Sequence, residues 1–123
     1  MADGLSTAVA DAALSTIIGT DAAYVQLHTG PPGAAGTANV SSTTTREAVT
    51  WGTPAAGSVA ASGTPEWTAW AGTNGEIDTD LSFWSAATAG TFGLSMPLSA
   101  SVTMDTGDSL TLTSLTVSIP TAS

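Results

Sequence analysis

Cysteine and lysine are both absent from the 123-residue sequence, and Arg46 is its single fixed cation. Without cysteine the chain has no disulfide, no thiol nucleophile and no cysteine-based zinc site. Ten acidic residues give a formal net charge of −9. Nucleic-acid backbones and anionic membrane surfaces are bound by lysine and arginine, so the composition argues against both partners. No apolar run approaches the length of a membrane span, so we expect no membrane insertion.

Charged residues make up only 9% of the sequence, whereas hydrophobic residues make up 42% and include four tryptophans. This composition supplies enough apolar surface to fold, and 123 residues is a common size for a single domain. We expect a helix over residues 1–20 that packs on the domain or on a neighbouring subunit. An antiparallel β-sandwich domain over residues 21–123 is expected to follow.

The expected helix places Leu5, Val9 and Ile17 at 3.6-type spacing. Asp3 is in position to cap its first turn. Gly19 is in position to end it in a left-handed conformation. We predict that Leu5, Val9 and Ile17 contribute to an interface.

From residue 23 onward the apolar period changes to two, which predicts β-strands. The expected strands cover residues 24–28, 45–51, 58–61, 66–70 and 77–84, with more after residue 92. Their short lengths and the glycine and proline between them predict a mainly β, antiparallel sandwich or barrel. Asn74-Gly75 predicts a two-residue hairpin, because both central positions of a type I′ turn need a positive φ. Asp78, Asp80 and Ser82 are expected on the polar face of their strand.

The acidic turns raise two chemical possibilities. Residues 105–107 read Asp-Thr-Gly, the catalytic triplet of aspartic proteases, in which two aspartates share a proton. Asp108 follows directly and would add a like charge, whereas a turn between two strands explains all four residues. Asp78, Asp80, Asp105 and Asp108 are calcium candidates if the turns meet, although solvated acids are favoured. We therefore predict no catalytic residue, no metal and no cofactor.

Four further side chains have more than one interpretation. His28 has no partner pattern around it, which favours a structural role over catalysis. Arg46 is expected to pair with a carboxylate, such as Glu66 or Glu76, or with one on a neighbouring subunit. Trp67 and Trp70 have opposite strand parity, so one is expected to point outward.

Outward tryptophans are how many sugar-binding modules stack a pyranose ring. Trp84 also has the opposite parity to the apolar residues of its strand. Packing in the core or at a subunit interface is the favoured alternative. The predicted interface residues therefore include Arg46, Trp67, Trp70 and Trp84.

Several stretches resemble a family of small tailed-phage virion proteins, described as tail-fibre or minor tail proteins, chiefly from phages of actinobacteria. The resemblance rests on Y-V-Q-L-H-T-G-P-P-G-A-A-G-T-A-N-V (24–40), T-T-R-E-A-V-T-W (44–51), E-W-T-A-W (66–70), T-A-G-T-F (88–92) and D-T-G-D-S-L (105–110). It covers about the whole chain, including the N-terminal helix. The sequence departs at Pro31, where the family usually has aspartate.

The resemblance implies a non-enzymatic structural protein on the exterior of the phage particle, in the tail tip or tail fibre. We expect a homo-oligomer that assembles with other virion proteins through the helix and one sheet face. A capsid decoration protein is the alternative, and a carbohydrate-binding module that contacts a host-surface glycan is a further one. The strong negative charge suits an outer surface, since a protein facing packaged DNA would gain nothing from it.

Overall fold

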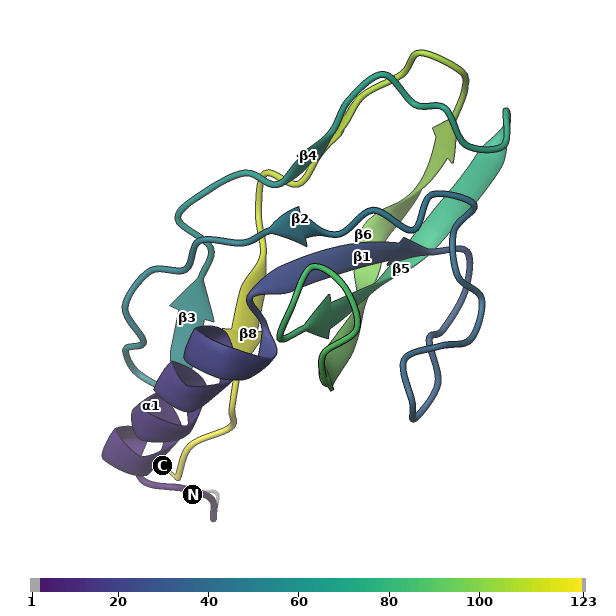
Figure 1. Ribbon diagram of the computed structural model, residues 1–123. Helices are drawn as coiled ribbons and strands as arrows, with labels where there is room; N and C mark the ends of the chain where they lie inside the picture. Colours follow the sequence, from purple (N-terminus) through teal and green to yellow (C-terminus); the bar gives the residue numbers. More distant parts are fainter. Residues whose placement is uncertain (1–2, 123) are drawn as a thin grey trace.

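Alternating apolar residues after a short helical segment give the fold that the sequence predicts: mainly β, antiparallel, with one N-terminal helix. A computed structural model describes residues 3–122 (Figure 1). The elements are α1 (Thr7–Thr16), the π-helical turn η1 (Ile17–Asp21), β1 (Tyr24–His28), β2 (Glu47–Ala48), β3 (Ser58–Ala60), β4 (Glu66–Trp67), β5 (Glu76–Trp84), β6 (Phe92–Met104), β7 (Leu110–Thr111) and β8 (Thr116–Ser118). No helix within residues 3–122 is long and apolar enough to cross a membrane.

The strands form three antiparallel sheets. The largest has the order β2-β1-β5-β6, so β5 lies in the interior and β6 forms one edge. Two small sheets pair β3 with β8 and β4 with β7, and they bring the C-terminal segment back across the middle of the chain. The core lies between these layers and contains Val25, Leu27, Val49, Trp67, Trp70, Leu81, Phe83, Met104, Leu112 and Leu115.

The helix begins and ends differently from the sequence prediction. Ser6 caps α1 by accepting a hydrogen bond from the backbone N of Val9 at 3.2 Å, so Asp3 is not the cap. At its other end α1 continues into η1, and Gly19 lies inside this π-helical turn instead of ending the helix in a left-handed conformation. A wider helical turn carries the chain toward β1 without a glycine cap.

The buried face of α1 also differs from the prediction. Ala10 and Leu14 are fully buried, whereas Leu5 and Val9 are 42% and 53% exposed. A tight turn at Gly57 explains this orientation. The backbone N of Gly57 donates to the carboxylate of Asp11 at 2.8 Å, and α1 lies beside β3 (Figure 1). The small side chain of Ala10 therefore faces the turn and Val9 on the other face remains in solvent, whereas Leu5 precedes α1 and forms a bridge with Thr121.

The predicted hairpin at Asn74-Gly75 is wrong. Gly75 has a φ of 81°, but Asn74 does not have a positive φ, and the strands on either side of the turn do not pair with each other. The Oδ1 of Asn74 instead accepts from the backbone N of Thr106 at 2.9 Å. A two-residue hairpin forms at Ala56-Gly57, where both φ values are positive, at 53° and 75°.

The Ala56-Gly57 hairpin gives a testable prediction, because alanine in the left-handed region is strained by about 1 kcal/mol. Asparagine tolerates this conformation, so we expect Ala56→Asn to stabilise the fold by about 0.5–1 kcal/mol. Thermal unfolding followed by circular dichroism measures the shift. Ala71→Asn is the control, because Ala71 is also exposed but its φ is not positive. Equal shifts in both variants would contradict this interpretation.

The polar face predicted for β5 is interrupted by a bulge. Asp78 pairs with Val102, whereas Asp80 pairs with Pro97, so residues 98–101 of β6 have no partner on β5. Across this irregularity, the side chains of β5 that would be exposed become buried, and those that would be buried become exposed. Ile77 is 52% exposed and Asp78 is fully buried, which is the reverse of the predicted alternation.

Candidate functional site

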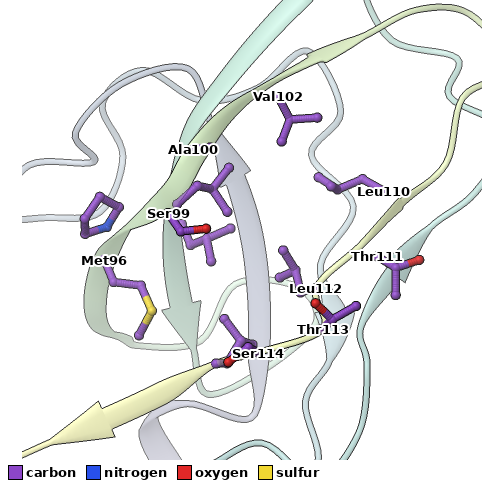
Figure 2. Close-up of a pocket in the computed structure, with 13 residues that line it drawn as sticks. Met96, Ser99, Ala100, Val102, Leu110, Thr111, Leu112, Thr113 and Ser114 are labelled. Atoms are coloured by element: carbon purple, nitrogen blue, oxygen red, sulfur yellow. The ribbon is translucent and has the colours of Figure 1, made fainter.

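An uncharged groove lies between β6 and the segment of residues 110–115, on the surface of the four-stranded sheet (Figure 2). Its volume is about 410 Å³. Leu98, Ser99 and Ala100, which belong to the bulge in β6, line one side. Figure 2 shows Leu110 facing β6 across the groove. The register change in β6 thus lies at the site of the groove.

The groove is continuous with the hydrophobic core. Leu81, Leu112 and Leu115 are buried at its base, whereas Met96, Leu98, Val102 and Leu110 are only half-buried. None of its thirteen lining residues is charged. Partly exposed apolar side chains gathered in one groove are typical of an interaction site.

Sequence reasoning did not identify these groove residues. A partial signal was available, because residues 81–104 and 109–123 contain no charged residue. All thirteen lining residues fall within these two stretches. Residues 22–45 and 48–65 are also uncharged and do not line the groove, so this signal does not by itself separate the groove from the rest of the chain.

The four tryptophans are not arranged for sugar stacking. Trp67 and Trp70 are 3% and 2% exposed, so the prediction that one of them points outward is wrong. Ala69, which separates them, has a φ of 50°, and this left-handed residue breaks the strand parity. Trp84 is 8% exposed, and Trp51 packs against Phe83. The indole rings therefore pack against other side chains of the same chain, and the buried tryptophans are not surface contact residues.

Within residues 3–122 Arg46 does not pair with an acid of its own chain, so the expected pairing with Glu66 or Glu76 is wrong, whereas a pairing with an acid on a neighbouring subunit stays a prediction. Its Nη1 donates to the backbone carbonyls of Ala86 and Ala89 at 2.9 and 2.6 Å, and its Nε donates to Gln26 at 3.0 Å. The guanidinium carbon also lies 4.0 Å from the centre of the Trp84 ring. This cation therefore holds the loop between β5 and β6 onto the sheet, and Glu66 and Glu76 are not its partners.

Two carboxyl groups lie together on β5, where strand parity places residues 76 and 78 on one face. Glu76 accepts hydrogen bonds from the Oγ of Ser41 at 2.5 Å and the backbone N of Ser42 at 2.8 Å. Burial raises the pKa of Glu76, but these hydrogen bonds together outweigh it, so its pKa is lowered overall. This carboxylate ties the loop at residues 41–42 to β5.

Asp78 is the second carboxyl group of this pair, and no donor reaches either of its oxygens. Its burial and, secondarily, the neighbouring Glu76 raise its pKa to about 7. Two ionised carboxylates can only accept hydrogen bonds, so Glu76 and Asp78 could not bond to each other in that state. A proton on Asp78 supplies the donor for a hydrogen bond between them. Asp78 is therefore not the solvated acid that the sequence predicts.

The remaining calcium and protease candidates form a local turn. The Oδ2 of Asp108 accepts from the backbone N of Asp105 at 2.9 Å, and the backbone N of Gly107 donates to the carbonyl of Trp70 at 2.9 Å. Asp80 accepts from Thr79 at 2.7 Å on β5. Within residues 3–122, no group of three or more acidic or histidine side chains is gathered to hold a metal ion.

His28 is fully buried and has two hydrogen-bond partners. Its Nδ1 lies 2.8 Å from the carbonyl oxygen of Ala38, and its Nε2 lies 2.6 Å from the Oγ of Ser82. A carbonyl oxygen only accepts, so Nδ1 carries the proton and Nε2 accepts from Ser82. Ser82 in turn accepts from the Nε1 of Trp84 at 2.7 Å. The serine–histidine pair is a satisfied structural chain, in agreement with the role predicted for His28.

Of the predicted helix contacts, Leu5 and Val9 are exposed, as given above, and Ile17 is half-buried against the core. Only Leu5 and Val9 are thus free to meet another subunit. Their role in an interface stays a prediction.

A comparison with protein families gives a match over almost the whole chain. The family model described as podophage GP4 fiber I protein gp80 matches residues 1–119. The chain belongs to this fibre family. The resemblance to phage tail-fibre proteins is thereby confirmed, and the protein is a structural component on the exterior of the phage particle. No match was found among curated proteins.

Membership of the fibre family fits the geometry described above. The residues with potential chemistry, which are His28, Ser82 and the turn at 105–108, are bound within the fold. The surface instead offers an uncharged apolar groove.

Proposed function

We propose that this chain is a non-enzymatic subunit of the phage tail fibre that assembles with further copies of itself and with other tail proteins. The match of the fibre family over residues 1–119 is the observation that carries this proposal. The uncharged groove supports it, because a subunit of an assembly needs a surface that can be covered. The net charge of −9 suits a protein that faces solvent outside the DNA-filled head.

Copy number in the particle tests this proposal. We expect quantitative mass spectrometry of purified virions to find this chain at a few per cent of the abundance of the major capsid protein. Tails and fibres contain few copies of each subunit, whereas a protein that covers the head is present in near-equal numbers to the capsid protein. Labelling with an antibody, followed by electron microscopy, should then place the chain on the tail.

Two results would contradict the tail-fibre assignment. Near-equal abundance with the capsid protein would make the chain a head decoration protein. Complete absence from washed particles would remove it from the virion. The recovery of a known tail protein in the same washed particles is the control for preparation, because it shows whether the washing step itself removes tail components.

A further inference from the structure

We propose that the loop of residues 41–43 is a strap beside Trp70 that opens when Asp78 loses its proton. Glu76 links the two, because it binds the strap and also lies beside Asp78 on β5. The strap is a change of shape within one chain, so it goes beyond the proposed function and does not depend on it.

Hydrogen bonds hold the strap closed. Glu76 accepts from the Oγ of Ser41 and from the backbone N of Ser42, as described above. The Oγ of Ser42 in turn accepts from the backbone N of Thr73 at 2.8 Å, in the segment that leads into β5. Both bonds from the strap to β5 therefore end on one carboxylate. The backbone N of Ser41 also donates to the carbonyl of Leu27 at 3.2 Å, which keeps the start of the strap on β1 when the rest opens.

The closed strap lies close to the ring of Trp70. Gly72 fills the space between them, because a Cβ added to it would meet the Oγ of Ser42 at 2.5 Å and the Cζ2 of Trp70 at 2.8 Å. Thr43 of the strap lines a second, smaller groove together with Trp67 and Trp70. Opening of the strap therefore widens this groove and lets water reach a buried indole.

The buried carboxyl group of Asp78 is the trigger. While Asp78 is protonated, it donates to Glu76, and the carboxylate of Glu76 still has lone pairs for the strap. Once Asp78 is ionised, two negative charges lie side by side, and no donor reaches either oxygen of Asp78. Glu76 is half-buried at the start of β5, whereas Asp78 is fully buried, so Glu76 is the group that turns into solvent. This movement breaks both of its bonds to the strap.

The elements around Asp78 offer no competing trigger within residues 3–122. β6, which pairs with Asp78 through Val102, has no ionisable side chain, and residues 29–45 have none either. The other ionisable side chains of β1, β5 and the adjoining turn are Tyr24, His28, Asp80, Asp105 and Asp108. None of these five contributes to the raised pKa of Asp78, which comes from its burial and then from Glu76.

Hydrogen exchange measured by NMR on the full chain tests the strap. The backbone N–H groups of Ser42 and Thr73 lose their acceptors when the strap opens. After correction for the intrinsic dependence of exchange on pH, we expect their protection to fall by about tenfold between about pH 6 and about pH 8. The indole N–H of Trp70, which donates to Thr73, should lose protection as well. The indole N–H of Trp51, which donates to the carbonyl of Ala22, should not.

Two variants separate the switch from a general loosening of the fold. Asparagine at position 78 has an amide N–H that donates to Glu76 at every pH, so in Asp78→Asn the protection of Ser42 and Thr73 should not fall. Asp80→Asn is the matched control, because it removes one negative charge from the same strand and should keep the fall of about tenfold. Thermal unfolding at both pH values confirms that each chain is folded.

Three results would overturn the strap proposal. The first is equal protection of Ser42 and Thr73 at both pH values in the wild type. The second is the same loss of protection in Asp78→Asn. The third is an equal loss at Trp51, which would mean that the whole chain loosens. The presence of the chain in virions bears on the proposed function and not on the strap, so each proposal can fail while the other stands.

Discussion

The stability advantage of Asp78→Asn over the wild-type chain is expected to grow by about 2–3 kcal/mol between pH 5 and pH 8. Asp78 is fully buried, no donor reaches its oxygens, and its pKa is about 7 in the folded chain. In the unfolded chain the ordinary value is 3.8. The folded state therefore holds a proton that the unfolded state has already released.

The sign of the effect follows from this difference. The stability that comes from protonated Asp78 is fully present below the unfolded pKa, and it is lost as the pH rises through the folded pKa near 7. Asparagine resembles the protonated acid in shape and carries no charge at any pH. The Asp78→Asn variant therefore does not lose this stability as the pH rises. Glu76, whose pKa is lowered, contributes with the opposite sign as the pH falls, so the window is kept above pH 5.

Urea unfolding at pH 5, 6, 7 and 8 measures this effect. Asp80→Asn is the matched control, because it removes one negative charge from the same strand at a half-buried carboxylate. We expect the gain over the wild type between pH 5 and pH 8 to be larger in Asp78→Asn than in Asp80→Asn, because Asp80 is not fully buried. Parallel curves for Asp78→Asn and the wild type would show that Asp78 is ionised in the folded protein, and the interpretation would then be wrong.

Gly93→Ala is expected to destabilise the chain by about 3 kcal/mol or more, because an added methyl group has no space. A Cβ at this position would meet the carbonyl oxygen of Asp21 at 2.3 Å and the Cβ of Asp21 at 2.8 Å. The first of these is backbone, which cannot rotate away. Either η1 or the start of β6 has to move, and both are fixed by their neighbours.

Gly19→Ala is the matched control for this prediction. Gly19 lies in η1 with nothing within 4 Å of an added Cβ and without a positive φ. Alanine at a helical position is favoured over glycine, so this variant should be unchanged or more stable by up to about 1 kcal/mol. The midpoint of thermal unfolding should therefore fall in Gly93→Ala and not in Gly19→Ala. Equal midpoints would mean that β6 and η1 do not touch.

The hydrophobic period predicted the helix, the antiparallel strands and most of the core, because these depend on residues close in sequence. It failed where the burial of a side chain depends on parts of the chain that are distant in sequence. Burial of Asp78 depends on the extra residues 98–101 in β6, and nothing near Asp78 shows that they are there. The burial of both Trp67 and Trp70 depends on the left-handed Ala69, which is an unusual position for alanine.

The candidate site was harder to predict than the fold for the same reason. Each side of the groove has an ordinary sequence, and the groove exists only because β6 and residues 110–115 come together. Arg46 shows a related failure. Because Arg46 is the single fixed cation among ten acids, an acidic partner was expected, but backbone carbonyls of the loop at residues 86–89 accept the hydrogen bonds of its guanidinium group. Composition states what a chain contains and leaves open which neutral acceptors surround a charge.

The pairing of β3 with β8 and of β4 with β7 has a consequence for synthesis of the chain. Leu112 and Leu115 belong to the core, and they lie at or near the strands that complete the two small sheets. A nascent chain on the ribosome cannot complete the core around Trp67 and Trp70 until these late residues have emerged. Folding dominated by contacts distant in sequence is slow. The protein therefore has to remain soluble while largely unpaired, and a net charge of −9, from ten acidic residues and one arginine, keeps neighbouring nascent chains apart.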